Sequence, residues 1–324
     1  MVVTQVARAT ARTYLFSKET TYGSSVTPAK DIGLVKSFTD SADQAYEPRF
    51  GQGSAKDIYI KGGYTIPKAT LDFEIQHGRP IEWLVYGGTT THSSTSGDTT
   101  HTFVWSDLLP SLTSDVGDPL GVSTTAIVDA VGNGLVGNST EISLDMKGVL
   151  KGRTDFIGQN INLSGATVTA ATVNTGAPLG GFQGSMKFGA TAVDYLQNWS
   201  ITCAGNTKDM PGQGSRNPQW VASHDRHITF KATIGEENST YLAEVLGSAT
   251  AITATEAAAQ SITFGADNGT TLGSGKLAFS MLLTGCQFKY DRKADTGDFV
   301  TYDLTGAGIP STCTFVDQIA SGAW

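Results

Sequence analysis

The 324-residue sequence repeats itself at an offset of 161 residues, and this repeat restricts the possible folds more than any single motif does. The tetrapeptide Gly-Gln-Gly-Ser occurs at 51–54 and again at 212–215. In the same ungapped register, the alternating apolar run 67–75 meets a second run at 228–236, and a helical pattern at 81–85 meets another at 242–246. We therefore expect two tandem copies of one domain, at 1–175 and 176–324, joined by the small-residue stretch 170–181.

The repeat continues at a second offset farther along the chain. Apolar residues alternate over 142–146 and again over 277–281, which gives an offset of 135. The difference between the two offsets predicts about 26 extra residues in the first copy, placed near 89–140.

Composition and alternation both indicate a mainly β chain. Charged residues make up only 16% of the sequence, and 38 residues are glycine. Polar and apolar residues alternate over Tyr64–Gln76 with the period of a strand. We expect this strand to follow a strand at Gly33–Thr39 and a long polar loop at Asp40–Gly63. Further strands are expected at 141–150, 155–163, 277–290 and 298–304.

One short helix is expected in each copy. In Arg79–Tyr86, Pro80 occupies a first-turn position where its missing N–H costs nothing, and two glycines follow the last residue. Ser239–Leu246 lies at the same place in the second copy. The predicted fold is therefore mainly β, with two tandem copies of a β-sandwich or barrel domain, each with one short α-helix.

Charge and cysteine content exclude several classes of protein. The net charge of −8 argues against a protein that binds nucleic acid by neutralising phosphates. The three cysteines, Cys203, Cys286 and Cys313, do not form a disulfide framework, so we expect a reducing compartment. Arg8 and Arg12 stand where an export signal needs its apolar core, and no run approaches the about 20 apolar residues of a membrane span.

No set of residues predicts an enzyme, a metal site or a cofactor site. His224 and His227 fall on opposite faces of a strand, so they are unsuited to sharing a metal ion. The segment Gly273–Lys276 lacks the spacing of a phosphate-binding loop, and a hairpin turn is the preferred interpretation. We therefore predict no catalytic, metal-binding or cofactor-binding residues.

Several motifs resemble the tail tube (major tail) proteins of long-tailed bacteriophages and related archaeal viruses. They are Lys18-Glu-Thr-Thr-Tyr-Gly23, the loop Pro48–Asp57, the segment Gln76-His-Gly-Arg-Pro80, and Thr102-Phe103 followed by Leu108–Ser111. Their order covers nearly all of residues 14–165. The second half resembles the family more loosely, and it lacks the Glu-Thr-Thr-Tyr-Gly start.

The resemblance implies a structural virion protein rather than an enzyme. Duplicated members form trimeric rings with pseudo-six-fold symmetry, which stack into a tube around the channel for viral DNA ejection. The implied partners are further copies of the chain, the terminator, distal tail, tape measure and assembly chaperone proteins, and DNA that passes without specific binding. The implied location is the virion tail, after assembly in the host cytoplasm, with no membrane partner.

Two sets of residues are candidates for a role in such an assembly. The long loops are expected to contact neighbouring subunits, because tyrosine, tryptophan and arginine are favoured in interfaces; the set is Tyr46, Arg49, Phe50, Gly51, Gly53, Gly212, Gly214, Arg216 and Trp220. An acidic strand face is expected to line the channel; the set is Asp72, Glu74, Glu141 and Asp145. Alternation alone leaves open whether this face lines the channel or the outside.

Two rival classes of function remain open. An adhesin or carbohydrate-binding β module fits the composition but predicts an export signal and exposed aromatic clusters. An enzyme on a duplicated β-barrel would need a convergent polar pocket.

Overall fold

The computed structural model describes residues 12–50, 57–95, 97–119, 127–164, 177–235, 260–271, 273, 275–294 and 300–319. The described chain is mainly β, which confirms the predicted class. Up to residue 164 the strands are β1 Thr13–Lys18, β2 Leu34–Phe50, β3 Asp57–Glu74, β4 Gly87–Thr95, β5 Asp98–Trp105, β6 Leu112–Pro119, β7 Ile127–Asp145, β8 Lys151–Ile157 and β9 Asn160–Ser164. From residue 177 they are β10 Gly184–Phe188, β11 Thr191–Ala192, β12 Leu196–Ala204, β13 Lys208–Pro211, β14 Pro218–Ala222, β15 His227–Gly235, β16 Gln260–Asp267, β17 Ala278–Ala294 and β18 Val300–Asp317.

Sixteen of these strands form one continuous sheet, and β13 and β14 form a separate pair. The main path runs β11-β10-β16-β17-β18-β15-β12-β7-β8-β3-β2, with β1, β4, β5, β6 and β9 attached beside it. The path has two ends, and none of the described sheets closes on itself. The barrel alternative of the predicted fold is therefore not supported.

The same order of neighbouring strands occurs twice along the sheet. Before residue 165 the neighbours run β1-β6-β7-β8-β3-β2, and after residue 176 they run β10-β16-β17-β18-β15-β12, all antiparallel. The first hairpin of each series also keeps the offset of 161. Leu71 lies opposite Phe38, and Ala232 lies opposite Trp199.

The second offset is not reproduced by the strand ladders. From Phe73 the ladders lead through Gly152 to Ile142. From Ile234, the position equivalent to Phe73, they lead to Arg292. The ladders therefore make Ile142 equivalent to Arg292, whereas the sequence match makes it equivalent to Leu277. Strand alternation repeats every two residues, so an apolar run also matches in a wrong register. The hairpin β4–β5, which pairs with β18 through Cys313 and Phe103, has no counterpart among the described residues of the second series.

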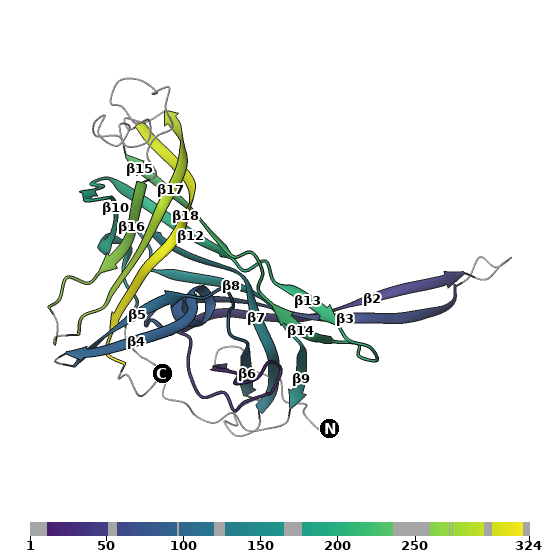
Figure 1. Ribbon diagram of the computed structural model, residues 1–324. Helices are drawn as coiled ribbons and strands as arrows, with labels where there is room; N and C mark the ends of the chain where they lie inside the picture. The colour runs from purple at the N-terminus through teal and green to yellow at the C-terminus, as the bar shows by residue number, and fades with distance from the viewer. Residues whose placement is uncertain are drawn as a thin grey trace, which may run out of the picture.

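The expected long loop at 40–63 is wrong, because most of this segment is strand. Strands β2 and β3 remain paired from Leu34 and Glu74 out to Phe50 and Asp57. We call residues 42–50 with 57–66 the arm. It projects from the body as a two-stranded ribbon (Figure 1).

The predicted helix at Arg79–Tyr86 is confirmed. It consists of one α-helical turn, α1 Arg79–Ile81, that continues as a π-helical turn, η2 Glu82–Tyr86, and it ends at Gly87 with φ 72°. A short 3-10 turn, η3 Gly181–Gln183, precedes β10. The predicted helix at Ser239–Leu246 lies outside the described residues.

The core contains the apolar face of the strands and the buried helix residues. Trp199 is the largest fully buried side chain, and its ring centroid lies 5.5 Å from that of Phe264 and 6.0 Å from that of Phe279. Burial of these rings fixes which face of each strand is turned inward, since a shift by one residue would expose the whole apolar set.

Candidate assembly surfaces

The two series of strands meet at one antiparallel seam between β7 and β12. Its register places Ile142 opposite Ile201, and Ser139 opposite Ala204. Both isoleucines are 1% exposed. The seam therefore combines a strand ladder with buried apolar contacts, the combination that stabilises a sheet most.

Arg226 fastens this seam to the helix. Its guanidinium donates hydrogen bonds to the backbone carbonyls of Val85, Tyr86 and Ser106. It also lies over the ring of Trp105, 3.9 Å from the centroid. A cation at the carboxyl end of a helix is favoured by the helix dipole, and a guanidinium presents several donors at once.

Arg226 is not among the residues predicted from the sequence, because the histidines on either side of it direct attention to a metal site. In the structure His224 Nδ1 lies 2.6 Å from an Asp225 carboxylate oxygen, and both side chains are exposed. The signal that could have been used is an arginine two residues before the alternating apolar run 228–234.

Two of the strand edges that lack a described neighbour lie at equivalent places in the two series, on β2 and on β17. Strand β2 pairs only with β3, so its outer edge is open along the described residues. Strand β17 pairs with β16 as far as Cys286, and no described strand lies on that side of residues 287–294. Open edges present unpaired N–H and C=O groups, which are templates for another strand.

The arm is formed by residues of the first predicted contact loop. Tyr46, Arg49 and Phe50 lie on β2, where the structure describes the backbone and not the side chains. Gly51 and Gly53 lie outside the described residues. The structure thus places the first three residues on a paired strand of the arm instead of in an irregular loop.

The second predicted contact loop, 204–220, folds as the hairpin β13–β14 against the body. Trp220 stacks on Tyr22 with centroids 6.1 Å apart, and it remains 55% exposed. The carbonyl of Arg216 accepts a hydrogen bond of 2.7 Å from the N–H of Thr65 at the base of the arm.

Gly212 and Gly214 lie in the turn of this hairpin. Gly214 has φ 78°, a backbone conformation that favours glycine.

The four acidic residues proposed for the channel lie on one polar face of the sheet. Asp72, Glu74 and Glu141 border a surface hollow of about 430 Å³. Asp145 continues the same face of β7, and its carboxylate accepts a hydrogen bond of 2.8 Å from the backbone N–H of Lys147.

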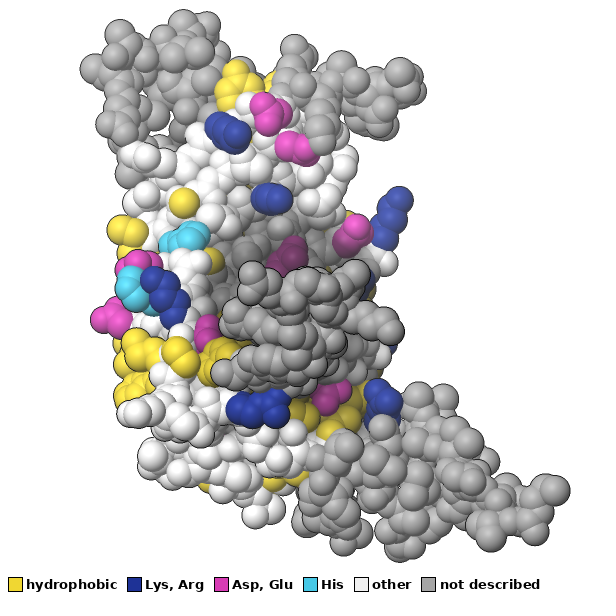
Figure 2. Space-filling view, turned by 90° about the vertical axis from the view of Figure 1, so that its right-hand side faces the viewer, with side chains coloured by type: hydrophobic (Ala, Val, Ile, Leu, Met, Phe, Trp, Pro, Cys, Tyr) yellow, Lys and Arg dark blue, Asp and Glu magenta, His cyan; other side chains and the backbone are white. Residues whose placement is uncertain are grey.

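Basic residues are mixed into this face. Lys36 lies 2.9 Å from Glu74, and Arg153 lies 3.5 Å from Asp72. Lys151 lines the same hollow. The face around these residues is therefore charge-balanced instead of acidic. The surface shown in Figure 2 likewise has acidic and basic side chains scattered among uncharged ones.

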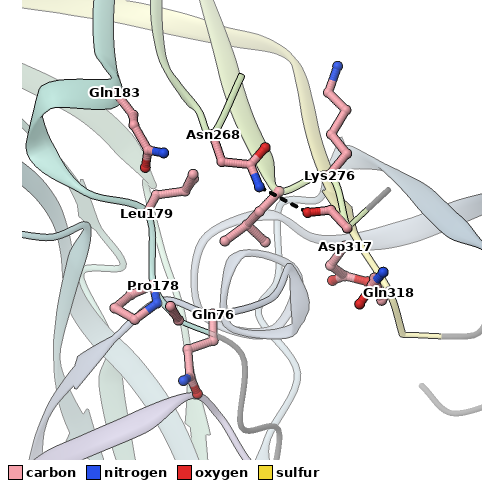
Figure 3. Close-up of a pocket in the computed structure, with 11 residues that line it drawn as sticks. Gln76, Pro178, Leu179, Gln183, Asn268, Lys276, Asp317 and Gln318 are labelled. Carbon is pink, nitrogen blue, oxygen red and sulfur yellow. Dashed lines mark hydrogen bonds between the residues drawn. The ribbon is translucent and has the colours of Figure 1, made fainter. Parts of the chain in front are cut away.

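A second hollow, of about 310 Å³, lies near the end of β18 and contains none of the predicted site residues. Figure 3 shows amide side chains of Gln76, Gln183 and Asn268 around it. The carboxylate of Asp317 is already bound by His101 at 2.9 Å and by the N–H groups of Gly78 and Ile319. The lining therefore offers polar contacts, and it includes the amine of Lys276.

Among the described residues, no group of three or more His, Cys, Asp or Glu side chains is arranged to hold a metal ion. Within the same part of the chain, no helix is long and apolar enough to cross a membrane.

The described residues define a mainly β protein with a projecting arm and with unpaired edges at equivalent places on β2 and β17. Comparison with protein-family models and with curated proteins found no match.

Proposed function

We propose that this chain is a tail tube subunit of a long-tailed virus, in which three chains form a ring of six similar halves and the rings stack around a DNA channel. One observation carries the proposal. The same strand order occurs twice, the two series are joined at β7–β12, and the equivalent edges on β17 and β2 have no neighbour among the described residues. We infer from this order that the two halves are copies of one domain.

A ring follows from repeating the internal seam between chains. Strand β17 occupies the place of β7 in its series, and β2 occupies the place of β12. A head-to-tail contact of this kind closes into a ring when the rotation is right. Each half contributes four strands to the shared polar face, so six halves would give a barrel of about 24 strands, wider than the 16–18-stranded barrels that leave an aqueous channel.

The arm supports stacking of rings. A two-stranded ribbon is marginally stable alone in water, so a projecting arm gains stability from a partner. An adjacent ring supplies such a partner at every copy. The proposed contact residues on the arm are Tyr46, Arg49 and Phe50, and the proposal also includes Gly51 and Gly53, which lie outside the described residues.

The charge-balanced polar face suits a channel through which DNA passes without specific binding. Mixed charges give no strong attraction for phosphate, and association with DNA depends on positive charge. In this proposal Asp72, Glu74, Glu141 and Asp145 face the channel. The further partners are the terminator, distal tail, tape measure and chaperone proteins, and the location is the virion tail.

Electron microscopy of the purified chain, combined with mass measurement of single particles, tests the proposal. We expect rings of three chains that stack into tubes. Deleting Gln44–Lys56 should leave folded rings that no longer stack, with folding checked by circular dichroism. A chain that stays monomeric at high concentration, or rings of six full-length chains, would overturn the proposal. Binding of a monomer to polysaccharide would favour the adhesin class instead.

A further inference from the structure

We propose a defined register for the contact between chains, in which β17 of one chain pairs antiparallel with β2 of the next, Asp40 lies opposite Arg292, and Asp43 lies opposite Lys289. The occupant of each open edge is thus a second copy of this chain. This inference rests on the proposed ring, because it specifies how neighbouring chains join within it.

The register follows from the seam inside the chain. Residue Ile201 of β12 corresponds to Asp40 of β2 through the offset of 161, which the hairpin registers reproduce. Residue Ile142 of β7 corresponds to Arg292 of β17 through the ladders from Phe73 and Ile234. Since Ile201 lies opposite Ile142 in the internal seam, Asp40 lies opposite Arg292 in the seam between chains.

A second pair is obtained in the same way. Ala204 of β12 corresponds to Asp43. Its partner Ser139 corresponds to Lys289. In the strand ladders Asp155 connects Ser139 to β3, and Thr305 connects Lys289 to the equivalent position of β15. The two edges therefore have opposite charges at two matching positions.

At the first pair, the seam inside the chain has a buried apolar contact, whereas the proposed seam between chains has an ionic one. Ile142 and Ile201 are each 1% exposed, whereas Asp40 is exposed at the open edge of the isolated chain. Pairing the edges would cover Asp40, and a covered carboxylate is tolerated only beside a cation. Arg292 supplies that cation at the matching position. A charged residue at an edge also discourages pairing with unrelated strands.

Charge exchange at Asp40 and Arg292 tests the register in the full-length protein. Asp40→Arg and Arg292→Asp should each fold as the wild type does, because no described strand pairs with either position on its open side. Each should raise the protein concentration needed for ring formation by at least about 100-fold, since it places like charges in a covered contact. The double variant should form rings at the wild-type concentration. Asp107→Arg, the same charge change at an exposed loop position, should assemble normally.

Mixing the two single variants tests the number of chains as well. Each variant can then pair only with the other, so the chains must alternate around a ring. Alternation is impossible with three members, and we expect open chains or even-numbered rings instead of the wild-type ring. Normal rings from Asp40→Arg, or a double variant that fails to recover, would overturn the register while leaving the ring itself intact. A wild-type chain that forms no rings would overturn both proposals.

Discussion

Replacing Arg226 by alanine should destabilise the folded chain by about 3–4 kcal/mol. The variant loses the stacking over Trp105, worth about 1 kcal/mol. It also leaves the carbonyls of Val85, Tyr86 and Ser106 without their charged donor, at about 1–2 kcal/mol for the most enclosed acceptor and less where water enters. Arg226→Lys keeps a charge near the end of the helix but cannot reach three carbonyls, so its loss should be about 2 kcal/mol.

Urea unfolding followed by circular dichroism measures these losses. The exposed Lys231, on strand β15 that follows Arg226, provides a control, and Lys231→Ala should change stability by less than about 0.5 kcal/mol. A double-mutant cycle with Trp105→Leu should give a coupling of about 1 kcal/mol with Arg226. The reasoning is refuted if Arg226→Ala costs less than about 1 kcal/mol, or if Arg226→Lys is as stable as the wild type.

Two further predictions concern titratable groups. Burial raises the pKa of the thiols of Cys203, Cys286 (to about 11) and Cys313. A thiol reagent at pH 8 should therefore label the native protein very slowly, and it should label all three cysteines after denaturation. Fast labelling of the native protein would contradict this prediction. Burial and the neighbouring His101 ring lower the pKa of His92, so the unfolded chain binds a proton more readily than the folded chain and stability falls as the pH drops below about 6.5. The variant His92→Gln should reduce this loss of stability, measured as the difference between urea midpoints at pH 7.5 and pH 5.5. An unchanged pH dependence would exclude the effect.

The sequence predicted the elements that bury a periodic set of side chains. The strand 64–76 and the helix 79–86 were both expected, and both are present because their apolar faces pack in the core. The offset of 161 also corresponds to a matching pair of hairpins in space.

The strands of the arm and the charge pairs of the polar face escaped prediction. The sequence of the arm mixes polar residues and glycines without the regular alternation that would distinguish a strand from a loop. Only the ladder from Leu34 to Phe50 reveals it as strand. The ion pairs of Asp72 and Glu74 depend on neighbours from β8 and β2. An unaligned sequence does not give that register, so an acidic face was expected where a charge-balanced one is found.

The internal seam is apolar and the proposed seam between chains is ionic. This difference is expected if the first seam forms during folding and the second during assembly. Inside the chain, Ile142 and Ile201 are buried and Arg226 fixes the helix beside them, so this contact forms as part of folding. At the open edge, Asp40 is exposed to water until a partner arrives. An ionic pair contributes less net stability than an apolar contact of similar size, but it discriminates strongly against an uncharged or like-charged strand. The offset of 161 places Thr65 at the position of Arg226, so the contact between chains also lacks the arginine that fastens the internal one. In the proposed ring, one strand geometry would therefore serve both a permanent junction inside the chain and a reversible, selective one between chains.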